Sequence, residues 1–322
     1  MDFKKLNIAT GWLVFLVATY TYISTIEPTA SFWDCGEFLA TANKLQVGHP
    51  PGAPLFMILG RIASAYVSPE HVPVAINILS ALCSSFTILF LFWSITHMAK
   101  KLATRDTDEP LTAGQLIAVL GSGIVGALAY TWSDSFWFSA VEAEVYSMSS
   151  FFTAITFWAI LKWESEADQP HNTRWLILIG YLLGLGIGIQ LLALLCIPAI
   201  GLVYYFKKYN TTTKGVFYAL VVSALVLGTI QAIIIPGVAK VAGWFELLFV
   251  NDLGLPFNTG NLVYGILFIG LTVWGLMWTQ RAGRVVLNTA ILAVAAILLG
   301  YSTYAMTVIR SLANPPIDEN NP

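Results

Sequence analysis

The sequence predicts an all-α fold, a polytopic bundle of about nine transmembrane helices. Composition is the first observation behind this prediction: 57% of the 322 residues are hydrophobic and 11% are charged, whereas soluble domains contain about 25% charged residues. The second is the mean hydropathy of +0.72. The third is that apolar runs long enough to cross a bilayer recur along the chain, with short polar segments between them.

The first apolar run covers residues 8–26 and follows Lys4 and Lys5. It is too long for a typical signal-peptide core, and no cleavage-site pattern follows it, so it is predicted to be the first span. The remaining predicted spans cover residues 74–98, 116–130, 147–163, 175–206 as two helices hinged near Gln190, 216–235, 262–278 and 285–306.

Two apolar stretches are predicted to lie at the membrane interface rather than to cross it. Residues 54–67 are interrupted by Arg61 and are fewer than the roughly 20 residues that a span needs. Residues 236–260 begin with a proline and mix aromatic with acidic residues. We therefore expect interfacial helices in the first outer loop and an interfacial segment after residue 235.

The distribution of basic residues fixes the predicted orientation. With the N-terminus inside, 12 of the 16 Lys and Arg residues fall on the inner side, as expected because inner loops are enriched in Lys and Arg. Counting residues 54–67 as a span would invert the loops that follow, which supports the interfacial interpretation. The outer side then holds Lys44, Arg61, Lys240 and Arg310, and the C-terminus is outside.

Carboxylates gather on the predicted outer side, in three loops that also contain tryptophans. These loops contain few Lys or Arg residues, whereas the inner loops pair their acids with bases. The pattern favours an acid-lined cavity open to the outer face over a chance clustering of solvated charges. The acids are Asp34, Glu37, Asp134, Glu142, Glu144, Glu246 and Asp252.

The stretch from residue 31 to 61 is the one around which the site is expected to form. Asp34 and Glu37 are three residues apart, so in a helix they share a face. Two interpretations stay open: an acid pair that acts as base, metal ligand or acceptor clamp, or an Asp34 that only caps an interfacial helix. The turn from Gly48 to Pro54 follows.

Other classes of function receive little support. The net charge is −2 and no basic patch indicates nucleic-acid binding. The three cysteines (Cys35, Cys83 and Cys196) are far apart and lack metal-site spacing, so they are expected to pack as small hydrophobes.

The segments FWDCGEF, GHPPGAPLF and VEAEVYS resemble a family that joins an animal transmembrane protein O-mannosyltransferase to bacterial membrane proteins. It is similar to the GT-C type of polytopic glycosyltransferase. The resemblance implies a bacterial inner-membrane enzyme whose active face is toward the periplasm. It would transfer a sugar, mannose in that family, from a polyprenyl-phosphate carrier in the membrane lipid to a hydroxyl of an exported protein.

The resemblance also assigns roles to residues. Asp34 matches the acid that engages the acceptor and is the expected catalytic base, and Glu37 matches a neighbouring acid that orients acceptor or water. Glu144 matches an acid of the second outer loop, with Glu142 as its partner. If this segment is helical, Glu142 shares a face with Tyr146 rather than with Glu144.

The lipid phosphate that leaves in such a reaction needs positive charge or a metal. Arg61 is the first choice, because Arg can grip phosphate with two hydrogen bonds, and Lys44 lies beside the motif. Headgroup contact at the interface is the alternative for Arg61. His49 either contacts phosphate or only stiffens its turn. No motif demands a metal or another cofactor, and a divalent cation held by Asp34 and Glu144 stays open.

Two other functions stay open. A flippase or transporter of lipid-linked sugars would use a broken helix at Gln190, in the run GLGIGIQ. A non-catalytic anchor of an envelope complex would need no polar cluster. Residues 1–308 are expected to form the transmembrane domain, and residues 309–322 an outer linker to a soluble domain.

Overall fold

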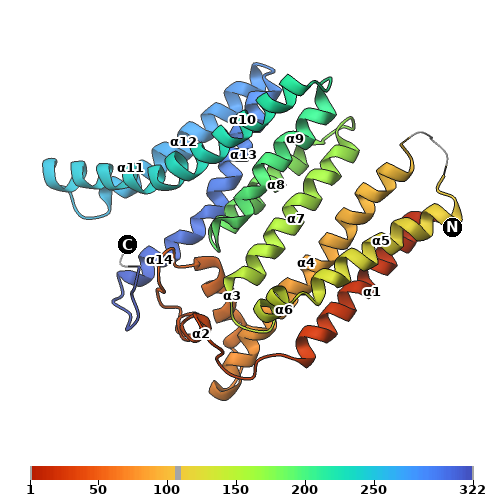
Figure 1. The fold of residues 1–322 in the computed structure, drawn as a ribbon. Helices are drawn as coiled ribbons and strands as arrows, with labels where there is room; N and C mark the ends of the chain where they lie inside the picture. The colour runs from red at the N-terminus through yellow and green to blue at the C-terminus, as the bar shows by residue number, and fades with distance from the viewer. Residues whose placement is uncertain (1, 106–109, 321–322) are drawn as a thin grey trace.

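The computed structural model describes residues 2–105 and 110–320, and helices make up most of these ranges (Figure 1). The predicted all-helical, polytopic class is confirmed. Seven helical stretches are long and apolar enough to cross a membrane. They are α1 (Phe3–Ser24), η1 (Pro69–His71) with α4 (Val72–Ala103), α5 (Ala113–Thr131), η2 (Leu191–Cys196) with α9 (Ile197–Lys208), the stretch Thr213–Asp252, α12 (Thr259–Arg281), and α13 (Val285–Tyr301) with η5 (Ser302–Tyr304) and α14 (Ala305–Ser311).

Two more helices complete the predicted set. α7 (Val145–Glu166) has 22 residues and packs between α4 and α8, and α8 (Thr173–Ile187) has 15 residues and packs on α7 and α13. Ser147, Ser149 and Thr156 of α7 are buried. A helix surrounded by other helices can hold such polar residues, because they face protein rather than lipid.

α8 and α13 approach each other through glycines of α8. A Cβ atom at Gly184 would lie 2.1 Å from the carbonyl oxygen of Ile297, and one at Gly180 would lie 2.8 Å from that of Ala293. Gly180 and Gly184 are four residues apart, so they form one face along which the two backbones touch.

The predicted hinge near Gln190 is confirmed. α8 ends at Ile187, Gln190 is extended with φ −162° and ψ 151°, and the 3-10 helix η2 leads into α9. The side-chain Oε1 of Gln190 is buried and forms no hydrogen bond within the described residues. The helix is therefore broken between two apolar halves.

The helix does not end at residue 235, where the predicted span ends. α10 (Thr213–Thr229) continues through the π-helical segment η3 (Ile230–Ile234) into α11 (Ile235–Leu247) and a second π segment, η4 (Leu248–Asp252). Pro236 lies in the first turn of α11. Proline lacks an N–H and would clash within an ordinary α-helix, and a π segment just before it loosens that turn. Figure 1 shows α10 and α11 as a continuous path.

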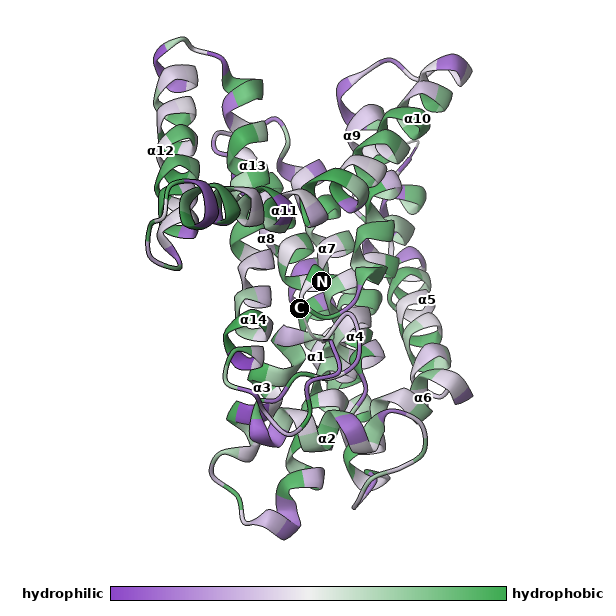
Figure 2. Cartoon of the chain, turned by 90° about the vertical axis from the view of Figure 1, so that its left-hand side faces the viewer, coloured by the Kyte–Doolittle hydropathy of each residue, from purple (hydrophilic) through white to green (hydrophobic). Residues whose placement is uncertain are grey.

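Short helices gather at one end of the bundle, which we call the site end. They are α2 (Cys35–Lys44), α3 (Pro54–Ser64) and α6 (Asp134–Ala140), and Figure 2 shows them opposite the α9–α10 and α12–α13 connections. We call that opposite end the basic end. At 11 residues α3 is too short to span a bilayer, as predicted. Phe38 of α2 and Phe56 and Met57 of α3 belong to the hydrophobic core, and both helices pack on α4.

Candidate functional site

Asp34 occupies the residue just before α2 but does not cap the helix. Its side chain makes no cap hydrogen bond within the described part of the chain, and it is exposed. The preceding Trp33 has a positive φ of 61°, which is uncommon for a residue other than glycine. The interpretation of Asp34 as a helix cap is therefore not supported, and its carboxylate is accessible at the site end.

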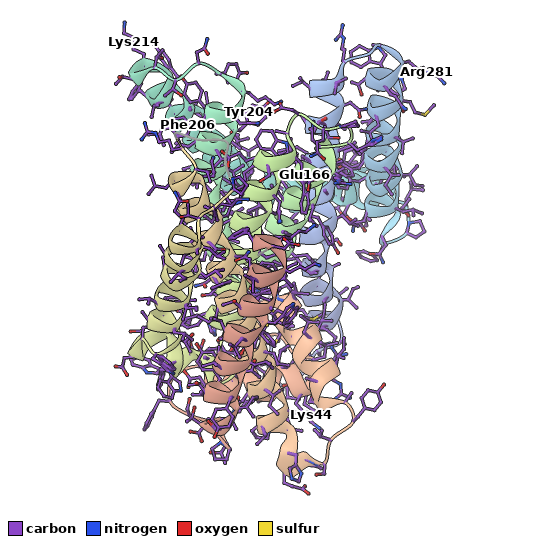
Figure 3. All side chains as sticks on the ribbon, turned by 90° about the vertical axis from the view of Figure 1, so that its right-hand side faces the viewer. Lys44, Glu166, Tyr204, Phe206, Lys214 and Arg281 are labelled. Carbon is purple, nitrogen blue, oxygen red and sulfur yellow. The ribbon has the colours of Figure 1, made fainter. Side chains whose placement is uncertain are left out.

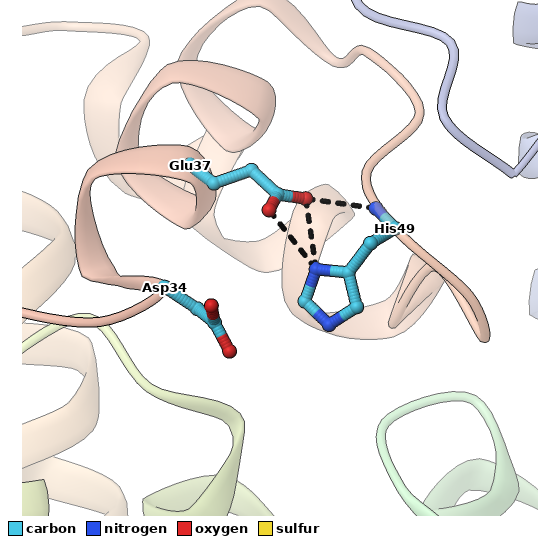
Figure 4. A group of neighbouring side chains, drawn as sticks. All are labelled: Asp34, Glu37 and His49. Atoms are coloured by element: carbon cyan, nitrogen blue, oxygen red, sulfur yellow. Dashed lines mark hydrogen bonds and ion pairs between the residues drawn. The ribbon is translucent and has the colours of Figure 1, made fainter.

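Glu37, one turn into α2, holds His49 of the following turn (Figure 4). One oxygen of Glu37 accepts a hydrogen bond from the backbone N–H of His49 at 2.8 Å. The ring atom Nδ1 of His49 lies 3.0 Å from both carboxylate oxygens. This hydrogen bond is the largest cause that raises the pKa of His49 above its usual value of 6.5. The pair therefore favours a positively charged imidazole beside Asp34.

The turn from Gln46 to Ala53 is shaped so that His49 reaches Glu37. α2 ends with Leu45 in a left-handed conformation, and the N–H of Gln46 bonds the carbonyl of Thr41, which together form a Schellman ending. At Gly48 a Cβ atom would lie 2.6 Å from Oε1 of Glu37. Only glycine allows the backbone to come this close to the carboxylate.

Glu144 of the second loop faces the same place. It is the residue before α7, it is 5% exposed, and its Oε2 has no hydrogen-bond partner within the described residues. The pKa of Glu144 is raised to about 7, mainly by burial and next by the charge of Asp34, while a backbone hydrogen bond from Val145 and the nearby His49 act in the opposite direction. The predicted convergence of the first and second loops is thus present in the structure.

Glu142 lies behind this cluster. It is 2% exposed and accepts a hydrogen bond from the hydroxyl of Ser31. Burial raises its pKa to about 7, with smaller contributions from the charges of Glu144 and Glu27. Two buried carboxyls whose pKa values lie near neutrality are a feature of functional sites more often than of structural ones.

Tyr146 does not share a helical face with Glu142. α7 begins at Val145, and Glu142 lies in the bend before it, so the helical register that the prediction assumed does not exist there. The Tyr146 side chain is 51% exposed. Its hydroxyl forms no hydrogen bond with a carboxylate among the described residues, so the structure does not support the predicted pairing of Tyr146 with Glu142.

Arg61 and Lys44 lie at the far end of α2 from Asp34. Arg61 donates to the carbonyl of Asn43 at 2.6 Å, and Lys44 is the last residue of the helix. Ten residues of helix separate Lys44 from Asp34, which corresponds to about 15 Å. These cations are therefore not beside the acids, and His49 is.

Sequence reasoning did not place Arg310 in the site. Its Nε donates to the carbonyl of Leu45 at 2.6 Å, so Arg310 joins Lys44 and Arg61 around the C-terminal end of α2. The signal that could have indicated it was its place among the four basic residues of the predicted outer side. A contact across 265 residues leaves no local pattern.

The third outer loop does not join the cluster through Glu246. Its carboxylate accepts hydrogen bonds from the backbone N–H groups of Asn258 and Asn261, at the start of α12. This is a capping interaction that satisfies free donors of the first helical turn. The described site is thus formed by two loops and not by three.

The residues beyond α14 pack on the first loop. Val47 forms an isolated parallel bridge with Asp318: its N–H donates to Ile317, and its carbonyl accepts from Glu319. Arg310 and this bridge hold the segment beside the turn that contains His49. The predicted linker, as far as residue 320, is therefore in contact with the site end.

A metal ion could be held by Asp34, Glu37 and His49, whose ligand atoms all lie within 4.8 Å of one another. This set differs from the Asp34–Glu144 pair expected from the sequence. Two carboxylates and an imidazole suit several divalent metals. However, Glu37 and Nδ1 of His49 already bind each other, so a metal would have to replace that contact or use Nε2.

The family model described as "Protein O-mannosyl-transferase TMEM260 N-terminal domain" matches residues 34–213, more than half of the chain. The match begins at Asp34 and includes both loops of the site. The chain belongs to this family. The TMEM260 N-terminal domain thus includes the carboxylate cluster, α3 and the break at Gln190, whereas α10 to α14 lie outside the matched region.

Two relatives of the TMEM260 family are similar over about half of the chain. The protein O-mannosyl-transferase tmem260 of Dictyostelium discoideum is 30% identical over 154 residues, which are 47% of this chain and 17% of that protein. The protein O-mannosyl-transferase TMEM260 of Mus musculus is 22% identical over 161 residues, 50% of this chain and 20% of that protein. The aligned part of the chain therefore covers at most about a fifth of these relatives. No solved structure matches the chain.

Proposed function

We propose that this protein is a glycosyltransferase that transfers a sugar from a polyprenyl-phosphate carrier to a hydroxyl group of an exported protein. The observation that supports it most is the cluster of Asp34, Glu37 and His49 within 4.8 Å, with buried Glu144 facing it. The names of the two relatives favour mannose as the sugar and a protein as the acceptor.

Asp34 is the proposed catalytic base, because it is the exposed carboxylate of the cluster. The acceptor oxygen forms a bond to the anomeric carbon while its proton passes to Asp34. The bond between that carbon and the phosphate oxygen breaks, and its electron pair leaves with the lipid phosphate. Proton removal of this kind contributes about 10²–10⁴-fold to a rate.

His49 is proposed to contact the phosphate of the leaving group. Glu37 keeps the imidazole protonated to higher pH, and a fixed positive charge stabilises the negative charge that develops on the phosphate. Lys44, Arg61 and Arg310 lie at the other end of α2, about 15 Å from Asp34. They are therefore proposed to bind parts of a substrate that are farther from the reacting atoms.

Glu144 is proposed to tune the site rather than to touch the acceptor, because it is almost fully buried. With its pKa near 7, it is partly protonated at neutral pH, and this limits repulsion between it and Asp34. Deprotonation of Glu144 at higher pH would then add a negative charge near Asp34 and make Asp34 a stronger base.

We place the active face on the outer side of a bacterial inner membrane, toward the periplasm. The excess of Lys and Arg in the connections at the basic end supports this orientation. Figure 3 shows Lys44 at one end of the bundle and Lys214 and Arg281 at the other.

Transfer of labelled sugar from a panel of polyprenyl-phosphate sugars to peptides rich in Ser and Thr tests the proposal. Wild type is expected to label the peptide, and Asp34→Asn to lose about 10²–10⁴-fold in rate with donor affinity kept. Asp134→Asn is the matched control, because Asp134 is an exposed carboxylate at the site end, on α6. The same assay with a chelator tests whether transfer requires a divalent metal ion.

The break at Gln190 supports a second candidate, a flippase of lipid-linked sugars. Its buried Oε1 lacks a hydrogen-bond partner among the described residues, and broken helices form substrate sites in transporters. If no donor is used for transfer, and lipid-linked sugar crosses liposome membranes at equal rates with wild type and Asp34→Asn, the flippase replaces the transferase.

A further inference from the structure

A cavity of about 830 Å³ lies at the basic end of the bundle, among α1, α4, α7 and α9. Its volume falls within the range of ligand pockets, about 300–1,000 Å³. The cavity is lined by residues from Trp158 to Ser165 near the C-terminus of α7, whereas the carboxylate cluster adjoins the N-terminus. At 1.5 Å per residue, the two are about 20–30 Å apart. The cavity is thus separate from the site already described.

Five lysines line this cavity: Lys4, Lys100, Lys101, Lys162 and Lys207. Two of them are neutralised by carboxylates, Lys101 by Glu164 at 2.5 Å and Lys207 by Asp168 at 2.8 Å. Lys4, Lys100 and Lys162 form no ion pair within residues 2–105 and 110–320. Among the described residues that line the cavity, five lysines therefore face a single carboxylate, that of Glu164.

Aromatic rings hold two of these cations in place. Nζ of Lys100 lies 4.8 Å from the centre of the Phe3 ring, and Nζ of Lys162 lies 5.4 Å from that of Trp158. A cation over an aromatic face is stabilised without losing its charge. The ammonium groups thus stay available to an anion.

One polar atom of the described cavity lining lacks a partner. Oδ1 of Asn7, on α1, is buried and forms no hydrogen bond within the described residues. Nε2 of His97 lies 3.6 Å from a carboxylate oxygen of Glu164 and pairs with it. Buried polar atoms normally have a partner, and an amide oxygen is an acceptor, so Oδ1 of Asn7 suits a hydroxyl donor of a bound ligand.

We propose that this cavity binds the phosphate headgroup of an anionic phospholipid. The lysines match a phosphate diester, and Trp93, Trp158 and Phe206 provide an apolar wall for the glycerol and the start of an acyl chain. Basic pockets between transmembrane helices on the cytoplasmic side bind anionic headgroups in this way. An inorganic or sugar phosphate is also an anion that lysines attract, but it leaves the aromatic wall uncovered. The inference is independent of the proposed transferase activity.

Native mass spectrometry of the full chain in neutral detergent, titrated with dioleoyl phosphatidylglycerol, tests the proposal. Lys100→Gln/Lys162→Gln is expected to weaken binding about tenfold or more. Lys5→Gln/Lys214→Gln is the matched control: it removes the same charge near the same end from exposed lysines outside the cavity, and is expected to change binding less than twofold. Phosphatidylcholine, glycerol 3-phosphate and inorganic phosphate are the comparison ligands.

Each other outcome would overturn the proposal. An equal loss in both double variants would mean diffuse surface attraction, and binding of phosphatidylcholine as tightly as phosphatidylglycerol would mean an apolar groove. Glycerol 3-phosphate or inorganic phosphate binding as tightly as the lipid would mean a site for a soluble anion. If the double variant does not fold, Trp158→Ala decides: severalfold weaker phosphatidylglycerol binding supports the lipid, and unchanged binding overturns it.

Discussion

The carboxylate of Glu37 binds both the backbone and the ring of His49. It accepts a hydrogen bond from the backbone N–H of His49 at 2.8 Å, and Nδ1 of His49 lies 3.0 Å from each of its oxygens. The two residues are 12 positions apart and come from a helix and a turn. One carboxylate thus both positions the turn and sets the charge of its imidazole. The relationship makes Glu37 a positioning residue for His49.

Glu37→Gln is expected to lower the pKa of His49 toward 6.5, because the amide lacks the charge that stabilises the imidazolium. Transfer activity should fall about 10–100-fold, as expected for loss of a hydrogen bond between charged groups. Titration of the His49 ring by NMR measures the first effect. The exposed pair Glu70–His71 offers a control: Glu70→Gln should leave the His49 titration unchanged, and a shift there would contradict a local effect.

In Glu144→Gln, the free energy of unfolding is expected to fall less with rising pH than in wild type. In the folded protein Glu144 keeps its proton up to pH about 7, whereas in the unfolded chain it titrates near 4.5. Wild type therefore loses stability between these values, by at most about 3 kcal/mol from this group. Unfolding of both forms in detergent between pH 5 and 8 measures this. Equal slopes would contradict the assignment, and Asp134→Asn should follow wild type.

Gly184→Ala is expected to destabilise the bundle by about 1–3 kcal/mol. The new Cβ would lie 2.1 Å from a backbone carbonyl of α13, which cannot turn away as a side chain can. Gly270→Ala is the control, because a Cβ there meets no atom within 4 Å in the described part of the chain. Thermal unfolding should separate the two variants, and a similar melting temperature would show that α8 and α13 are less closely packed.

Glu319→Pro is expected to release the first loop from the segment after α14. Proline removes the N–H that donates to the carbonyl of Val47, while Glu319→Ala keeps it. Hydrogen exchange of the peptide that contains Val47 should rise in the proline variant only. Faster exchange in the alanine variant as well would assign the contact to the Glu319 side chain instead.

The helices were predictable because the length of each apolar run and the polar residues at its ends can be read directly from the sequence. The same local logic found the break at Gln190 and the short α3. It did not predict that the helix continues through Pro236, because a proline usually marks a helix end and the π segment before it leaves no apolar period of its own.

The site was predictable in its acids and less so in their partners. Asp34, Glu37 and Glu144 stood out as carboxylates without nearby bases. Their charges could be assigned to one side of the membrane from the positive-inside rule alone. The hydrogen bonds of Arg61 and Arg310 with the end of α2 depend on how distant segments pack, and no spacing in the sequence encodes that.

The N–H of Leu55, in the first turn of α3, donates to the carbonyl of Gly188 at 2.8 Å. This hydrogen bond joins the start of α3, just after the turn that contains His49, to the broken segment between α8 and η2. A ligand that straightens or widens the break must therefore either pull α3 along or give up this hydrogen bond. A change at the break is thereby transmitted, through one carbonyl group, to α3 and to the turn that precedes it.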